Sequence, residues 1–287
     1  METRLWKLAR RSLPVGGRTL VMGVLNVTPD SFSDGGLFYD FGRAVERAEE
    51  MTAEGADIID VGGESTRPGG APVSVEDESR RVVPVIEAVA GVAGVPVSVD
   101  TTRAQVARAA LDAGAEIIND ISGLRFEPEL ADEAARAGAG LVLMHSRGER
   151  ETLHALEPVE DIMDEVVASL RRSVAEAVGR GVRSESIVID PGVGFGKSQE
   201  QNLELIARLD EFAAALPEFP VLVGTSRKSF IGRITGGAPA GERLHGTMAT
   251  VTAAILRGAH IVRVHDVRAA VETARVAEEI RAVNRQS

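Results

Sequence analysis

Eight short apolar segments that alternate with helical patterns predict an α/β fold for this chain of 287 residues, a single (β/α)8 TIM barrel. The segments are rich in Val and Ile and almost continuously apolar, as in strands that helices cover on both faces. The length suits one barrel of roughly 250 residues. Polar side chains lie at the end of nearly every segment, which favours a barrel. The structural alternative, an open doubly wound sheet, binds its ligand at one crevice only.

The predicted strands follow one another along the whole chain. They are residues 19–27, 57–63, 96–101, 116–122, 140–145, 186–192, 220–226 and 260–267. Helical spacing of apolar residues predicts helices over 41–54, 103–113, 160–180, 199–216, 243–257 and 268–283. Glycines stand where left-handed caps are expected between helix and strand, at Gly55, Gly114, Gly138, Gly181 and Gly258. Residues 1–18 are expected to form a short hairpin that closes the barrel bottom, and the barrel to span 19–287.

Composition excludes several classes of function. A net charge of −11 argues against nucleic acid as a partner, because binding phosphates requires a basic face. The absence of cysteine excludes disulfides, thiolate nucleophiles and cysteine-ligated zinc. Neither a signal peptide nor an apolar run of about 18 residues is found, so we expect a cytoplasmic protein with no membrane segment.

Polar side chains gather where the predicted strands end, which is where barrels of this class carry their chemistry. They are Asn26, Asp100, Asn119, Asp120, His145, Asp190, Arg263 and His265, and residues 225–228 follow the seventh strand. A single such residue could simply cap the next helix. The set as a whole is costly to bury unless a ligand pairs it. Two carboxylates and an amide suit the donor edge of an aminopyrimidinone, with Lys228 at a ring acceptor, and this chemistry leaves a pterin and a guanine both open.

Two long loops complete the predicted site. Residues 28–36 and 64–70 are rich in Gly, Pro, Ser and Asp, as binding loops often are. Thr66 and Arg67 are candidates for an oxyanion, and Arg263 and His265 add cationic or neutral donors. Asn26 offers an oxygen suited to Mg²⁺, which often holds a substrate pyrophosphate through few protein ligands.

Two apparent motifs are set aside. Residues 192–198 resemble a phosphate loop, but Pro191 stands where the motif requires glycine. The five histidines lack the spacing of a zinc protease site. Only three of the 32 basic residues are lysines, and two of these, Lys197 and Lys228, fall in predicted loops.

Eight segments taken together resemble the successive signature segments of the dihydropteroate synthases. They are GVLNVTPDSFSDGG (23–36), DIIDVGGESTRPGG (57–70), SVDT (98–101), INDISG (118–123), LMH (143–145), DPGVGFGK (190–197), GTSRKSFIG (224–232) and RVHDV (263–267). They lie in the family's order and span residues 23 to 267. One departure is Ser146 to Gly148, where many members have Met or Gln after the histidine; it lies outside the implied pockets.

The resemblance implies a TIM-barrel transferase of folate biosynthesis. It would join 6-hydroxymethyl-7,8-dihydropterin pyrophosphate to p-aminobenzoate, with Mg²⁺ as cofactor, and act as a homodimer. Catalytic roles would fall on Asp100, Asp190, Lys228, Arg263 and His265.

The same resemblance implies the ligand pockets. The pterin pocket would comprise Asp100, Asn119, Ile121, Met144, Asp190, Gly224 and Lys228. Pyrophosphate would meet Asn26, Thr66, Arg263 and His265, with Mg²⁺ at Asn26 and assistance from the loop residue Asp34. The p-aminobenzoate site, where sulfonamides would compete, would comprise Thr66, Arg67, Pro68, Phe195, Ser226 and Lys228.

Two alternatives share the pterin pocket. A methyltransferase that uses methyltetrahydrofolate on a related barrel would not need the STRPGG and SRKS segments. A pterin-binding homologue without activity is opposed by the presence of Asn26, Arg67, Lys228, Arg263 and His265.

Overall fold

The computed structural model describes residues 3–27, 37–64, 73–148 and 157–283. A ring of eight parallel strands forms its centre, which confirms the predicted barrel. The strands are β3 (Leu20–Asn26), β4 (Ile58–Gly62), β5 (Val97–Asp100), β6 (Ile117–Asp120), β7 (Gly140–Met144), β8 (Ile187–Asp190), β9 (Leu222–Val223) and β10 (Ile261–Val264). They pair in the order β8-β7-β6-β5-β4-β3-β10-β9, and a parallel bridge between Ile189 and Val221 joins the two ends of this order.

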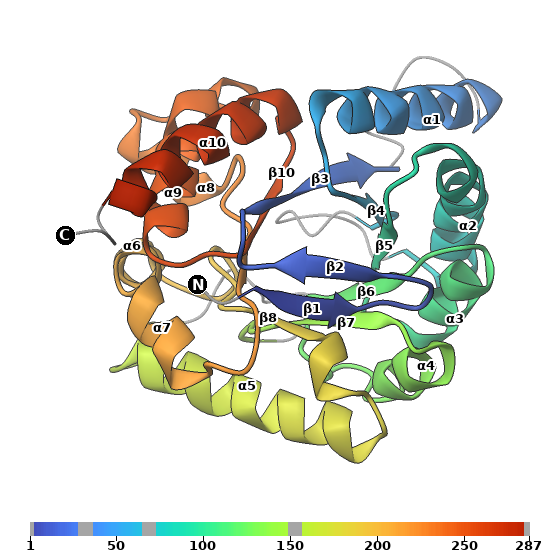
Figure 1. Cartoon of the computed structure of the whole chain (residues 1–287), viewed down its shortest axis with the longest axis horizontal. Helices are drawn as coiled ribbons and strands as arrows, with labels where there is room; N and C mark the ends of the chain where they lie inside the picture. The colour runs from blue at the N-terminus through green and yellow to red at the C-terminus, as the bar shows by residue number, and fades with distance from the viewer. Residues whose placement is uncertain (1–2, 28–36, 65–72, 149–156, 284–287) are drawn as a thin grey trace.

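Helices surround the ring on the outside (Figure 1). They are α1 (Leu37–Glu54), α2 (Val75–Val92), α3 (Ala104–Asp112), α4 (Leu130–Ala137), α5 (Ile162–Gly179), α6 (Gln199–Ala207), α7 (Leu209–Ala215), α8 (Ser229–Ile234), α9 (Leu244–Leu256) and α10 (Val267–Val283), with short 3-10 helices η2 (Ser184–Ser186) and η3 (Ala240–Glu242). The helix predicted over 199–216 is in fact two, because the backbone leaves the helical region at Arg208, with φ −110° and ψ 24°. The five glycines expected after helices all have positive φ.

An antiparallel hairpin of β1 (Arg4–Lys7) and β2 (Ser12–Val15) lies across the barrel (Figure 1). Trp6 is 1% exposed, and its indole Nε1 donates to the carbonyl of Ser186 at 2.8 Å, just before β8. A Cβ at Gly140, the first residue of β7, would lie 2.6 Å from Leu8 Cδ2. The hairpin therefore covers the N-terminal ends of the strands, as predicted, and the opposite ends remain for the site.

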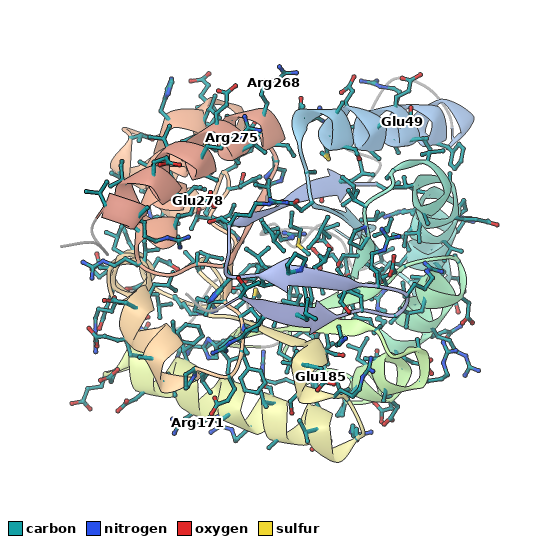
Figure 2. The ribbon with its side chains drawn as sticks, in the orientation of Figure 1. Glu49, Arg171, Glu185, Arg268, Arg275 and Glu278 are labelled. Atoms are coloured by element: carbon teal, nitrogen blue, oxygen red, sulfur yellow. The ribbon has the colours of Figure 1, made fainter. Side chains whose placement is uncertain are left out.

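Apolar side chains fill the barrel and the layer beneath its helices. Next to the hairpin they are Leu20, Met22, Ile58, Ile117, Val142, Val188, Leu222 and Ile261. Each large aliphatic side chain buried in this way contributes about 1.5–3 kcal/mol to folding. Charged side chains such as Glu49, Arg171 and Arg268 lie on the outer helices (Figure 2), as expected for the outer surface of a barrel.

None of the helices in the described ranges combines the length and the apolar character that crossing a bilayer requires.

Candidate active site

The C-terminal ends of β3 to β6 bring predicted site residues into one row. Asn26 is in register with Gly62, Gly62 with Asp100, and Asp100 with Asn119. A Cβ at Gly62 would lie 3.7 Å from Asn26 Oδ1 and 3.5 Å from Asp100 Cβ. Because Gly62 has no side chain, space remains between Asn26 and Asp100 at the mouth of the barrel.

Arg263 binds two carboxylates that come from neighbouring strands of this row. Its Nη2 donates to Asp100 Oδ2 at 2.5 Å, and its Nε donates to Asp60 Oδ2 at 2.6 Å. The same Asp60 oxygen accepts from Asn119 Nδ2 at 3.0 Å. Arg263, predicted as a cation for pyrophosphate, is thus tied to the carboxylates beside the pterin residues.

Burial and charge shift the pKa values within this network. Burial raises the pKa of Asp100 to about 7, although the charge of Arg263 opposes the shift. Burial alone would lower the pKa of Arg263, but the charges of Asp60 and Asp100 raise it above its ordinary value. Arg263 therefore stays charged at any pH of interest, whereas Asp100 titrates near neutrality.

Asp190 and Lys228 form the other side of the mouth. Asp190 ends β8, and its Oδ1 accepts from the backbone N–H of Gly192 at 2.7 Å. Burial raises the pKa of Asp190 to about 6, against the opposing effects of the Gly192 hydrogen bond and the charge of Lys228. Burial, together with Arg263, lowers the pKa of Lys228 to about 8. The positive charges of Lys228 and Arg263 oppose the rise in pKa of both Asp100 and Asp190. The four side chains therefore lie close together.

Apolar side chains line the mouth between these charges. Ile121, Met144 and Phe195 form one buried cluster, with Phe126 packed against it. Lys228 Nζ lies 3.8 Å from the centre of the Phe195 ring. The fold therefore brings together residues predicted for the pterin pocket (Ile121 and Met144) and for the p-aminobenzoate site (Phe195).

Lys197, in the loop next to Phe195, directs its ammonium toward backbone carbonyls. Its ammonium donates to the backbone carbonyls of Gly192, Phe195 and His145, at 2.7, 3.0 and 3.2 Å. Burial lowers its pKa to about 7. The side chain thus holds the loop after β8 in place from inside.

Ser226 and His265 connect the loops after β9 and β10. Ser226 Oγ lies 2.9 Å from His265 Nδ1 and accepts from the His265 backbone N–H at 3.2 Å. Burial, helped by the charge of Arg263, lowers the pKa of His265 to about 3. In the absence of a bound anion, His265 is therefore held in its neutral form at pH 7.

A bidentate ion pair binds the same two loops together beside Lys228. Arg227 Nε and Nη2 donate to Asp266 Oδ2 and Oδ1 at 3.1 and 2.6 Å. Arg227 has a φ of 59°, a left-handed conformation that non-glycine residues adopt at a cost. The ion pair holds this unfavourable turn, which directly precedes Lys228.

Of the remaining predicted residues, the structure describes one and leaves four undescribed. Gly224 follows β9, and a Cβ there would lie 3.8 Å from Arg263 Cβ. Asp34, Thr66, Arg67 and Pro68 lie outside the described residues, so their predicted places in the pyrophosphate and amine sites stay predictions.

The residue that the sequence analysis did not single out is Asp60. The sequence does contain a signal for Asp60, because a carboxylate inside the otherwise apolar strand β4 is as unusual as Arg263 inside β10. It also lies two residues before Gly62, and hence on the same face of β4. Its partners depend on the strand register, which the sequence alone does not specify.

No protein-built metal centre is found in the described ranges. They hold no group of three or more His, Cys, Asp or Glu side chains placed to bind one ion.

Comparisons with known proteins agree with this geometry. The family model described as pterin binding enzyme matches residues 22–265. A dihydropteroate synthase of Synechocystis is 48% identical over 265 residues, with 92% of this chain and 91% of the relative covered.

Solved structures give the same result. A Xanthomonas albilineans dihydropteroate synthase with 4-aminobenzoic acid superposes with a TM-score of 0.89 at 42% identity, covering 96% of this chain and 98% of that one. A Burkholderia cenocepacia dihydropteroate synthase complexed with 7,8-dihydropteroate gives 0.87 at 40% identity and covers both chains fully. The chain therefore belongs to the pterin-binding enzymes and, within them, to the dihydropteroate synthase family.

Proposed function

We propose that this chain is a dihydropteroate synthase. It transfers the dihydropterinylmethyl group of 6-hydroxymethyl-7,8-dihydropterin pyrophosphate to the amine of p-aminobenzoate, yielding 7,8-dihydropteroate and pyrophosphate for folate synthesis. The observation that carries the proposal is the convergence of Asp100, Asn119, Asp190 and Lys228 at one barrel mouth, in a chain of this family.

The pterin ring is the ligand that suits these polar groups. Its ring N–H and exocyclic amino group donate to Asp100, Asp190 and the amide oxygen of Asn119. Lys228 donates to a ring acceptor. Ile121, Met144 and Gly224 provide the walls of the pocket.

The p-aminobenzoate site is proposed next to Phe195, on the loop side of Lys228. Ser226 and residues 66–68 complete it, with Arg67 suited to the carboxylate. Sulfonamides, which resemble this substrate, would compete here.

The pyrophosphate is proposed to meet Asn26, Thr66, Arg263 and His265. Mg²⁺ fits this donor set, because it takes oxygen ligands and is often held by one or two protein oxygens together with substrate phosphates. Asn26 Oδ1 lies 3.7 Å from the position that a Cβ would take at Gly62, so it is not covered by a side chain from that residue. When bound, Mg²⁺ supplies positive charge to the departing pyrophosphate.

The reaction breaks a C–O bond and forms a C–N bond. In the proposed order pyrophosphate leaves first, and Asp100 and Asp190, in their ionised forms, stabilise the delocalised pterin cation. Exclusion of water from the site would protect the cation, which water would otherwise capture. The amine of p-aminobenzoate then attacks the methylene carbon and loses a proton.

A turnover assay with dihydropterin pyrophosphate, p-aminobenzoate and Mg²⁺, each omitted in turn, tests this proposal. We expect dihydropteroate only when all three are present. We also expect pyrophosphate release without p-aminobenzoate, because departure comes first. Pyrophosphate release that strictly requires the amine would contradict the order and favour direct displacement. Pterin binding without any turnover would identify an inactive homologue. The homodimer implied by the family stays a prediction, and the mass in solution tests it.

A further inference from the structure

Asp60 is a buried carboxylate in the middle of β4 with none of the roles proposed above. Its relative exposure is 0%, and its strand neighbours Ile59 and Val61 are equally buried. The side chain lies on the same face of the strand as Gly62, one layer below the row of site residues. A hydrophobic side chain in this layer would avoid the cost of burying a charge.

The two carboxylate oxygens of Asp60 differ in their partners. Oδ2 accepts from both Arg263 Nε and Asn119 Nδ2, at 2.6 and 3.0 Å. Oδ1 is buried and has no hydrogen-bond partner among the described residues. A carboxylate that served only stability would be expected to have both oxygens paired. The unequal pairing indicates that Asp60 is retained for the two side chains that it holds.

The contact with Asp60 fixes which way the Asn119 amide points. A carboxylate only accepts hydrogen bonds, so the amide must turn its NH₂ group toward Asp60. Its oxygen is then the atom left to accept a donor from a ligand. With the amide reversed, Asn119 would present a donor and repel the exocyclic amino group of a pterin.

The same contact fixes the guanidinium of Arg263. Nε binds Asp60 while Nη2 binds Asp100, so the planar group is held at two points by carboxylates from β4 and β5. Without Asp60, the guanidinium could rotate about its remaining contact with Asp100 and compete with the pterin for that carboxylate.

We propose that Asp60 is a positioning residue that sets the ligand preference of the pterin pocket, by orienting the Asn119 amide and the Arg263 guanidinium. The inference rests on the proposed function, because it assigns these two side chains to substrate binding. It leads to a specific consequence: Asp60 makes the pocket prefer a 2-amino ring, the pterin, over the 2-oxo ring of a lumazine.

The test compares Asp60→Leu with the parent protein and with Asp57→Leu, because leucine, unlike asparagine, keeps no oxygen that could still accept from Asn119 and Arg263. Asp57 is the matched control, a carboxylate just before the other end of β4 that accepts from Arg18 Nη1 at 2.8 Å and from the Val21 backbone N–H at 2.9 Å. Both changes remove a carboxylate from a salt bridge and replace it with an apolar side chain of similar size. Calorimetry measures the dissociation constants of 6-hydroxymethylpterin and 6-hydroxymethyllumazine for each protein, and circular dichroism follows thermal unfolding.

Asp60→Leu should reduce the preference for the pterin over the lumazine about tenfold, because the Asn119 amide can then turn either its oxygen or its NH₂ group toward the ring, a difference of about one hydrogen bond. Its kcat/KM should fall about 100-fold, as expected when site groups shift by about 1 Å. Asp57→Leu should leave the preference unchanged. A ratio of dissociation constants does not depend on the folded fraction, so a destabilised variant remains informative.

Two outcomes would overturn the proposal, and a third concerns the function itself. An unchanged preference in Asp60→Leu, or an equal loss in Asp57→Leu, would show that Asp60 serves only the fold. If the parent protein fails to bind the pterin at all, the proposed function fails instead, and the two failures are thus distinguishable.

Discussion

Burial brings the pKa values of the two carboxyl groups and of the lysine at this site close together. Asp190 and Asp100 have pKa values of about 6 and about 7, and Lys228 has one of about 8. In the ligand-free site, the charged forms of all three coexist only near neutral pH. A ring that donates to the carboxylates and accepts from the ammonium stabilises these forms, which is how a pterin would be favoured.

The pH dependence of kcat/KM should therefore be bell-shaped. As pH falls through about 7 and then about 6, Asp100 and Asp190 become protonated and lose their role as charged acceptors. As pH rises through about 8, Lys228 loses its proton. Because kcat/KM reports the free enzyme, steady-state assays from pH 5 to about 9.5 should show both limbs.

Two variants show whether the acid and alkaline limbs of the pH profile come from the protein or from titration of the substrate. Lys228→Arg should lose the alkaline limb, because a guanidinium keeps its charge throughout this range. Asp190→Asn should alter the acid limb of its residual activity, whereas titration of the substrate phosphates would leave the limb in place. A flat profile in the parent protein would contradict the assigned charges.

The loop after β8 shows how one side chain can organise an element. Lys197 places three donors on the carbonyls of His145, Gly192 and Phe195. A compact ammonium suits three acceptors around one point better than the planar fork of arginine does. This geometry gives a physical reason for a lysine at this position in a chain whose basic residues are nearly all arginine.

Lys197→Met should raise the KM for p-aminobenzoate more than it lowers kcat. The change removes the ammonium from three carbonyls, of which that of Gly192 still accepts from the Phe195 backbone N–H at 3.2 Å, and it loosens Phe195, which Lys228 contacts. We expect an increase of about 3- to 10-fold in this KM, since one net hydrogen bond is worth about 1 kcal/mol. Steady-state kinetics at saturating pterin substrate measures it. Lys7→Met, on the hairpin at the far end of the barrel, is the control and should change neither constant.

An unchanged KM together with a lowered melting temperature would show that the loop supports only the fold. Restoration of the KM by Lys197→Arg would show that a positive charge suffices and that the compact shape is not required.

At the scale of the whole molecule, the barrel determines how far the sequence predicts the site. Parallel strands place their C-terminal ends together, so Asp100, Asn119 and Asp190 could be grouped without knowing any distance. The hairpin was predicted over residues 1–18, and its two strands β1 and β2 lie within them. Residues near strand ends were therefore predictable from their positions.

Partners within the site were not predictable in the same way. Asp60 meets Asn119 and Arg263 because of strand register and side-chain length, which apolar periodicity does not encode. The break at Arg208 has a similar origin, since the apolar pattern continues through it and only the packed structure shows two helices. The pKa values of Asp100 and Lys228 also depend on burial, which appears only in the folded molecule.

A crystal structure of the protein with bound 6-hydroxymethylpterin tests the central claim most directly. We expect the ring at the C-terminal mouth of the barrel, with Asp100, Asn119, Asp190 and Lys228 each within about 3.2 Å of a ring donor or acceptor. A ring bound elsewhere, or bound at the mouth without hydrogen bonds to these four side chains, would contradict the assignment.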